Sequence, residues 1–177
     1  MRTMVGVGVF DKVDMIAWML EGIRDNFDPS QTEVVFFFEA CKDESESEFD
    51  RLAPQLISNF KFSKGSSQKH IDEVGVHNWL IERFIDSECD ALIIPHDDNK
   101  FMRPIVPDLE RLFARYGQSL GWISGRDGHG MGYENMCCSP FSKSTGAPMR
   151  ELPIGTWEEV LMMNTGPVVY FRHVVMR

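Results

Sequence analysis

Two neighbouring carboxylates directly follow a short apolar run near the middle of the chain. Ala91–Ile94 contains only apolar residues, is preceded by charged residues and is closed by Pro95. Because the run shows no polar alternation, it predicts a strand that is buried on both faces, as parallel strands of α/β sheets are. Asp97 and Asp98 follow at its carboxyl end, which is the edge where ligands bind in open parallel sheets.

Adjacent carboxylates repel each other unless a cation or hydrogen-bond donors lie between them. Their hard oxygen atoms suit Mg²⁺ or Mn²⁺, which commonly bridge a protein carboxylate to a substrate phosphate. The alternative is a solvated turn, because Asp and Asn are common turn residues. The buried strand before Asp97 and Asp98 makes a divalent-metal site as good an interpretation of the pair as the turn.

Strands and helices alternate along most of the chain. Apolar runs predict strands at Met4–Phe10, Glu33–Phe38, Phe60–Phe62, Ala91–Ile94, Leu120–Ser124 and Val168–Val175. Apolar residues at helical spacing predict helices at about Ile16–Phe27, Phe49–Leu56, Ile71–Ile85, Pro104–Tyr116 and Thr156–Met163. This order predicts an α/β, Rossmann-like fold in which helices cover both faces of one mostly parallel central sheet.

Finer predictions concern the ends and faces of these elements. Asp11 or Asp14 is expected to cap the first helix. The segment Ser63–Gln68 is expected to be a loop, and Pro54 is expected to start or interrupt its helix. One side of the helix before the central strand is expected to carry Ile71, Val74, Asn78, Ile81 and Ile85.

The overall charge limits the partners that the chain can have. A net charge of −9 and a pI near 5.0 argue against binding to nucleic acid or to anionic membranes. No window approaches a transmembrane span and the N-terminus lacks a signal-peptide layout, so a cytoplasmic protein is expected. The four cysteines form no Cys-x-x-Cys pair and are expected to be reduced.

Four segments together carry a family resemblance. They are the opening strand and helix at Val5–Ile16, Glu39 at the end of the second strand, the stretch Gly75–Asn78, and Leu92–Asn99. In this order they resemble the nucleotide-sugar-binding half of a GT-A-fold glycosyltransferase, most like the large family 2 group. In that family an Asp usually takes the place of Glu39, and an acidic metal motif follows the strand that Leu92–Asn99 resembles.

The resemblance implies that the chain binds a nucleoside-diphosphate sugar, expected to be a UDP-sugar, and transfers the sugar to an unknown acceptor. The implied nucleotide contacts come from Asp11, Glu39, Asn78 and Asp97. The implied ligands of Mn²⁺ or Mg²⁺ are Asp97, Asp98 and His173. The candidates for the catalytic base are Asp127, His129 and Glu134. A divalent ion would neutralise the diphosphate that leaves as the glycosidic bond breaks.

Departures from the family pattern keep a second hypothesis open. Asp97 and Asp98 are adjacent rather than separated by one residue, and the chain ends at Arg177 where the family usually continues to its catalytic base. Within a single domain of residues 1–177, we expect a nucleotide-sugar-binding part at 1–124 and a reduced acceptor part at 125–177. The alternative is a non-catalytic nucleotide-sugar-binding module, or a fragment, on the same fold.

Overall fold

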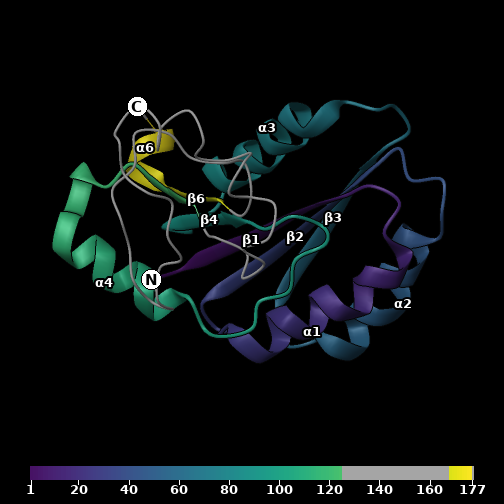
Figure 1. Ribbon diagram of the computed structural model, residues 1–177, viewed down its shortest axis with the longest axis horizontal. Helices are drawn as coiled ribbons and strands as arrows, with labels where there is room; N and C mark the ends of the chain where they lie inside the picture. The colour runs from purple at the N-terminus through teal and green to yellow at the C-terminus, as the bar shows by residue number, and fades with distance from the viewer. Residues whose placement is uncertain (125–167, 177) are drawn as a thin grey trace, which may run out of the picture.

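A computed structural model describes residues 1–124 and 168–176, which form a central sheet covered by helices (Figure 1). Its strands are β1 (Thr3–Val9), β2 (Thr32–Glu39), β3 (Lys61–Ser67), β4 (Ala91–Ile94), β5 (Trp122–Ser124) and β6 (Val168–Phe171). Its α-helices are α1 (Ile16–Asn26), α2 (Ser45–Leu56), α3 (Asp72–Ile85), α4 (Val106–Tyr116) and α6 (Arg172–Val175). Short 3-10 helices at Val13–Met15 and Gly117–Ser119 precede α1 and follow α4.

The described strands form one sheet in the order β3-β2-β1-β4-β6-β5. The pairs β2–β3, β1–β2 and β1–β4 are parallel, whereas β6 runs antiparallel to both β4 and β5. The predicted α/β fold with a mostly parallel sheet is therefore confirmed. None of the helices among these residues is long and apolar enough to cross a membrane.

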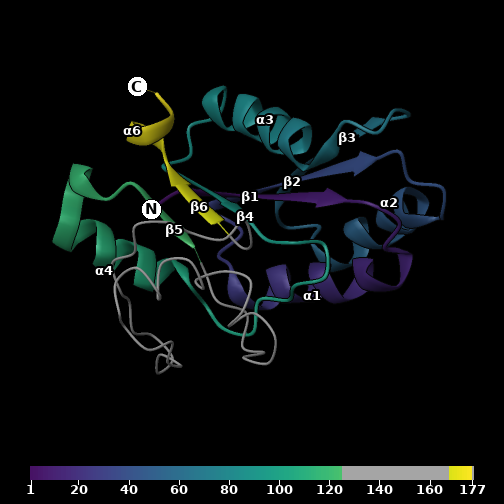
Figure 2. The ribbon, with the colours of Figure 1, turned by 45° about the horizontal axis from the view of Figure 1, so that its top comes forward.

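Successive residues of the inner strands point to opposite faces of the sheet and build two cores. Val5, Val7 and Val9 of β1 pack on the face that α1 and α2 cover, together with Leu109 and Leu112 of α4. Met4 of the same strand packs on the other face, which α3 covers with Val76, Leu80 and Phe84. Figure 2 shows α3 on one side of the sheet and α1 and α2 on the other. Both faces of β1 are thus buried, as the apolar runs predicted.

Two glycines of β1 set the position of α3. A Cβ atom added to Gly8 would lie 2.5 Å from Val76, and one added to Gly6 would lie 3.0 Å from Leu80. Because both glycines lack a side chain, α3 can lie directly on the strand. The buried side of α3 is therefore that of Val76, Leu80 and Phe84, whereas Val74 is 67% exposed and Asn78 is also exposed. The side predicted to carry Val74 and Asn78 is thus not the one that packs on the sheet.

The edge strand β3 was predicted only in part. It continues to Ser67 through most of the segment expected to be a loop, and it pairs with β2 from Glu33 to Glu39. An edge strand that is largely exposed needs no apolar pattern, because its backbone pairing alone keeps it extended. Likewise α2 begins earlier than predicted, at Ser45, and runs through Pro54.

The last described segment changes from strand to helix at Arg172. The strand predicted to reach Val175 ends at Phe171, the residue that pairs with the first residue of β4. The Arg172 guanidinium donates hydrogen bonds to carbonyls that follow or end α3, at 2.8 Å to Phe84, 2.8 Å to Ser87 and 2.6 Å to Cys89. A cation at a helix C-terminus satisfies carbonyls that the helix leaves without partners.

Replacement of Arg172 should therefore weaken the whole fold. We expect Arg172→Met to lower the free energy of unfolding by about 2–3 kcal/mol, because several carbonyls lose a charged donor together. Urea unfolding followed by circular dichroism measures this change. Arg24→Met, which removes only an exposed pair with Asp25, is the matched control and should cost about 0.5 kcal/mol or less. Equal losses in the two variants would contradict the assigned role of Arg172.

Candidate functional site

The candidate site lies at the carboxyl edge of the sheet, where the strand order changes direction. β2 and β3 lie to one side of β1, and β4 lies to the other. Loops that leave two neighbouring strands in opposite directions open a crevice in which α/β proteins bind ligands. Here Asp97, in the loop after β4, accepts a hydrogen bond at 3.1 Å from the backbone amide of Phe10 after β1. The two loops are therefore joined where this type of fold favours a ligand.

Asp97 and Asp98 differ in their surroundings. Asp97 is half-buried, whereas Asp98 is exposed. Burial raises the pKa of the Asp97 carboxyl and the charge of Asp98 adds to this, although the Phe10 amide and Lys12 act in the opposite direction. The ionised form of Asp97 is thus incompletely compensated by its protein neighbours. A carboxylate in that situation gains from a nearby cation.

Asn99 adds an amide oxygen beside these carboxylates. Its Nδ2 atom donates to Asp98 Oδ1 at 3.2 Å, and its backbone amide donates to the carbonyl of His96 at 3.1 Å. Its Oδ1 atom is buried and has no hydrogen-bond partner among the described residues. Carboxylate and amide oxygens are the ligands that Mg²⁺ and Mn²⁺ prefer. The donor atoms of Asp97, Asp98 and Asn99 therefore fit a hard divalent ion.

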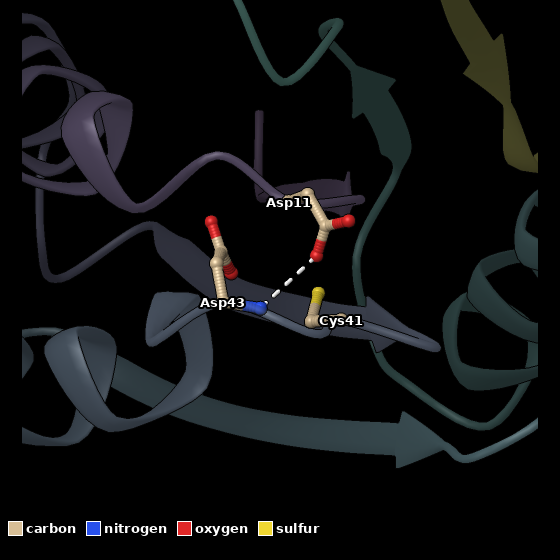
Figure 3. A group of neighbouring side chains, drawn as sticks. All are labelled: Asp11, Cys41 and Asp43. Carbon is tan, nitrogen blue, oxygen red and sulfur yellow. Dashed lines mark hydrogen bonds between the residues drawn. The ribbon is translucent and has the colours of Figure 1, made fainter.

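The loops after β1 and β2 are held together by carboxylates that bind backbone amides (Figure 3). Asp11 accepts hydrogen bonds from the amides of Lys42 at 2.6 Å and Asp43 at 3.2 Å. In return Asp43 accepts from the amide of Val13 at 2.9 Å. The start of the first helical segment is thus capped from the neighbouring loop. The predicted cap by Asp11 or Asp14 is wrong, because neither carboxylate binds an amide of that helix.

Cys41 lies between these two carboxylates. One ligand atom from each of Asp11, Cys41 and Asp43 lies within 4.8 Å of the others. However, the Cys41 thiol donates to the carbonyl of Val9 at 3.3 Å, and burial raises its pKa. Burial alone would also raise the pKa of Asp43, but hydrogen bonds from Ser45 and Val13 lower it. These hydrogen bonds account for the arrangement of the three side chains without a metal ion.

Glu39 lies at the same edge but is already engaged. It is 5% exposed, and its Oε1 atom accepts a hydrogen bond from the amide of Ile71 and lies 3.0 Å from His70 Nδ1. The ring of His70 in turn contacts the ring of Phe10, with 5.6 Å between centroids. Neither His70 nor Phe10 was predicted from the sequence to belong to the site. Their proximity depends on the ends of three strands that are distant in sequence.

Other predicted site residues lie elsewhere. Asn78 is exposed on α3, on the side away from the buried Val76 and Leu80. His173 cannot join Asp97 around one ion, because β6 is antiparallel to β4 and His173 therefore lies beyond the opposite end of β4. Its Nε2 atom is 2.9 Å from the carbonyl of Leu120. The implied role of His173 as a metal ligand is corrected accordingly.

The three candidates for the catalytic base lie outside the described residues. Asp127, His129 and Glu134 all fall between 125 and 167. Of the residues predicted to contact the nucleotide, Asp11, Glu39 and Asp97 come together at the carboxyl edge.

Comparison with solved structures identifies the fold. No family model and no curated protein sequence matches the chain. Residues 1–349 of TarS from S. aureus match at a TM-score of 0.63 with 12% identity, over 97% of this chain and 47% of that one. A mannosyltransferase from Pyrobaculum calidifontis, solved with GDP-mannose and Mn²⁺, matches at a TM-score of 0.61 with 16% identity. This match covers 71% of this chain and 35% of the mannosyltransferase. The fold is that of a GT-A glycosyltransferase.

A third neighbour extends the comparison. Glucosyl-3-phosphoglycerate synthase from Mycobacterium tuberculosis, solved with Mn²⁺, UDP and phosphoglyceric acid, matches at a TM-score of 0.58 with 15% identity. The match covers 97% of this chain and 56% of the synthase. The chain thus spans between about a third and somewhat more than half of these GT-A glycosyltransferases.

The buried charge of Asp97 makes a prediction about stability. Because the folded state raises the pKa of Asp97, ionisation of this group opposes folding at pH values above that pKa. We expect Asp97→Asn, without added metal, to raise the free energy of unfolding at pH 7 by on the order of 0.5 kcal/mol. The gain should disappear once the pH falls below the ordinary carboxyl pKa of 3.8, where Asp97 is protonated in both states.

Urea unfolding at pH 7 and at pH 3.5 provides the measurement. Asp86→Asn, at an exposed aspartate just after α3, is the control and should change little at either pH. A loss of stability in Asp97→Asn at pH 7 would show that Asp97 is well compensated by the protein alone.

Proposed function

We propose that this chain is the donor-binding part of a metal-dependent glycosyltransferase. It binds a nucleoside-diphosphate sugar, with a UDP-sugar as the expected donor, and transfers the sugar to the hydroxyl group of an acceptor. The observation that carries this proposal is Asp97, a half-buried and poorly compensated carboxylate tied to Phe10 between the ends of β1 and β4. Structural neighbours solved with Mn²⁺ and with UDP or GDP-mannose support it.

The residues around Asp97 suit Mn²⁺ or Mg²⁺. Asp97 and Asp98 would hold the ion, and the unpaired Oδ1 atom of Asn99 is a further oxygen donor beside them. When bound, the ion supplies Lewis-acid stabilisation of the negative charge on the leaving diphosphate. A pair of like charges that repel each other in the free protein would thereby be used for binding.

The other residues of the edge hold the binding loops in place. Asp11 and Asp43 bind amides across the loops after β1 and β2, and Glu39 binds the loop after β3. Loops fixed in this way lose little conformational freedom when a ligand binds, which favours affinity. Lys12 lies close enough to Asp97 to lower its pKa, so its charge also reaches the place proposed for the diphosphate.

A binding module without transferase activity is the second candidate. The chain spans 35% to 56% of the three neighbours described above, and donor binding alone is compatible with the part of them that it matches. Incubation with UDP-sugars and simple acceptors, followed by mass spectrometry, separates the two candidates. Transfer to an acceptor would support the enzyme and make Asp127, His129 and Glu134 the first residues to replace. Intact donor, or donor hydrolysed without transfer, would support the binding module.

The proposed metal site predicts the behaviour of a double variant. We expect Asp97→Asn combined with Asp98→Asn to abolish Mn²⁺-dependent binding of UDP in isothermal titration calorimetry, because both charged ligands are lost. The circular dichroism spectrum without ligand should match that of the wild type and the melting temperature should not fall, since asparagine keeps the size and the hydrogen-bonding oxygen of each side chain.

The matched control is Asp25→Asn combined with Asp86→Asn. These exposed residues lie at the ends of α1 and α3, and their replacement changes the net charge by the same amount. The control should bind UDP as the wild type does. If the Asp97 and Asp98 variant bound UDP with the affinity of the wild type, the acidic pair would be a solvated turn and not a metal site.

A further inference from the structure

Phe10, Glu39 and His70 meet at the carboxyl edge beside Asp97. Phe10 follows β1, Glu39 ends β2, and His70 lies in the loop after β3. The ring of Phe10 is inclined at 52° to that of His70, and Phe10 is 44% exposed. The backbone amide of Phe10 is bonded to Asp97. An open aromatic surface therefore lies next to the residues that fit a divalent ion.

Glu39 lies against one nitrogen of the His70 ring. The Oε1 atom of Glu39 lies 3.0 Å from Nδ1 of His70, and because a carboxylate offers only acceptor atoms, this ion-pair contact favours a ring proton on Nδ1. In the neutral ring the other nitrogen, Nε2, then carries a lone pair and is an acceptor. The side chain of His70 is 67% exposed, and no hydrogen bond reaches Nε2 within residues 1–124 and 168–176. The structure thus presents one oriented acceptor at the rim of the aromatic surface.

We infer that His70 determines which nucleobase the chain binds, by accepting an N–H hydrogen bond from a base that lies against Phe10. This inference rests on the proposed function, because a nucleoside diphosphate at the edge supplies the base. Uracil and guanine carry an N–H group in the ring on their pairing edge, whereas cytosine and adenine carry a lone pair there. The site is therefore selective for uracil or guanine against cytosine and adenine.

The positions of these residues along the carboxyl edge match the positions of the diphosphate and the base in a nucleoside diphosphate. A diphosphate near Asp97 and Asp98 leaves the base one strand further along, toward β1 and β2, where Phe10 and His70 lie. Aromatic rings bind nucleobases by stacking with little regard to sequence, so Phe10 supplies affinity for any base. Discrimination between bases needs a directional hydrogen bond, because a site that binds an N–H group rejects an analogue without it.

Glu39 takes an indirect part in this arrangement. The family resemblance implied that Glu39 contacts the nucleotide, but its Oε1 atom is already in contact with the Ile71 amide and with His70. Glu39 is thus a positioning residue that acts through His70. It holds the loop and sets which ring nitrogen faces the ligand.

The test compares ligands that differ at one atom. In the presence of Mn²⁺, calorimetry gives the dissociation constants of UDP, of 3-methyl-UDP, in which the N–H group is blocked, and of CDP and pyrophosphate. We expect the wild type to bind UDP roughly tenfold more tightly than 3-methyl-UDP or CDP, which corresponds to one hydrogen bond. This comparison needs no substitution and so does not depend on the folding of a variant.

Variants then show which residue causes the difference in affinity between UDP and 3-methyl-UDP. His70→Asn keeps an amide that can donate to Glu39 but removes Nε2, so UDP and 3-methyl-UDP should bind equally. Phe10→Leu should weaken the binding of UDP and of 3-methyl-UDP by the same factor and leave the binding of pyrophosphate unchanged. Gln68→Ala, at an exposed neutral residue in the same loop, is the control. It should keep the wild-type ratio of the dissociation constants of 3-methyl-UDP and UDP.

The failures of the two proposals are distinguishable. Equal binding of UDP and 3-methyl-UDP by the wild type, or a wild-type ratio in His70→Asn, would overturn the role of His70 and leave the proposed function standing. Absence of any Mn²⁺-dependent binding of UDP, GDP or pyrophosphate would overturn the proposed function, and the inference about His70 with it.

Discussion

The pairing of β1 with strands on both sides is the constraint on which the rest of the structure depends. β1 lies between β2 and β4 and is parallel to both, so all three end at the same edge. The chain turns in opposite directions from the ends of β1 and β4, and the candidate site lies between them. Gly6 and Gly8 let α3 lie directly on this strand, which buries that face of it.

The acidic residues of this edge divide into two groups. Asp11, Asp43 and Glu39 bind backbone amides and thereby fix three loops. Asp97 is compensated less completely by the protein, since burial raises its pKa, and Asp98 beside it is exposed. Such a division is physically reasonable for a site that must hold a polyanion through a cation. The first group keeps the loops ordered, and the second group remains able to gain from an ion.

How much could be predicted depended on whether the deciding contact was local. The strand at Ala91–Ile94 was confirmed residue for residue, because an apolar run closed by proline is a local signal. Most of Ser63–Gln68 proved to be strand, because an edge strand follows its neighbour and not its own pattern. The contact between Glu39 and His70 could not be predicted, since it forms only when the ends of β2 and β3 lie side by side. The sequence therefore predicted the acidic pair and its edge, but not which acids were already engaged.

Coupling between metal and nucleotide tests the central claim, that Asp97 and Asp98 hold a divalent ion which in turn holds a diphosphate. The melting temperature of the protein should be measured while Mn²⁺ and UDP are varied separately and together. A ligand that binds only the folded state raises its stability, so two ligands that need each other raise it more together than the sum of their separate effects. The account predicts such an excess for Mn²⁺ with UDP. Additive effects, or the same effect of UDP with and without Mn²⁺, would contradict it.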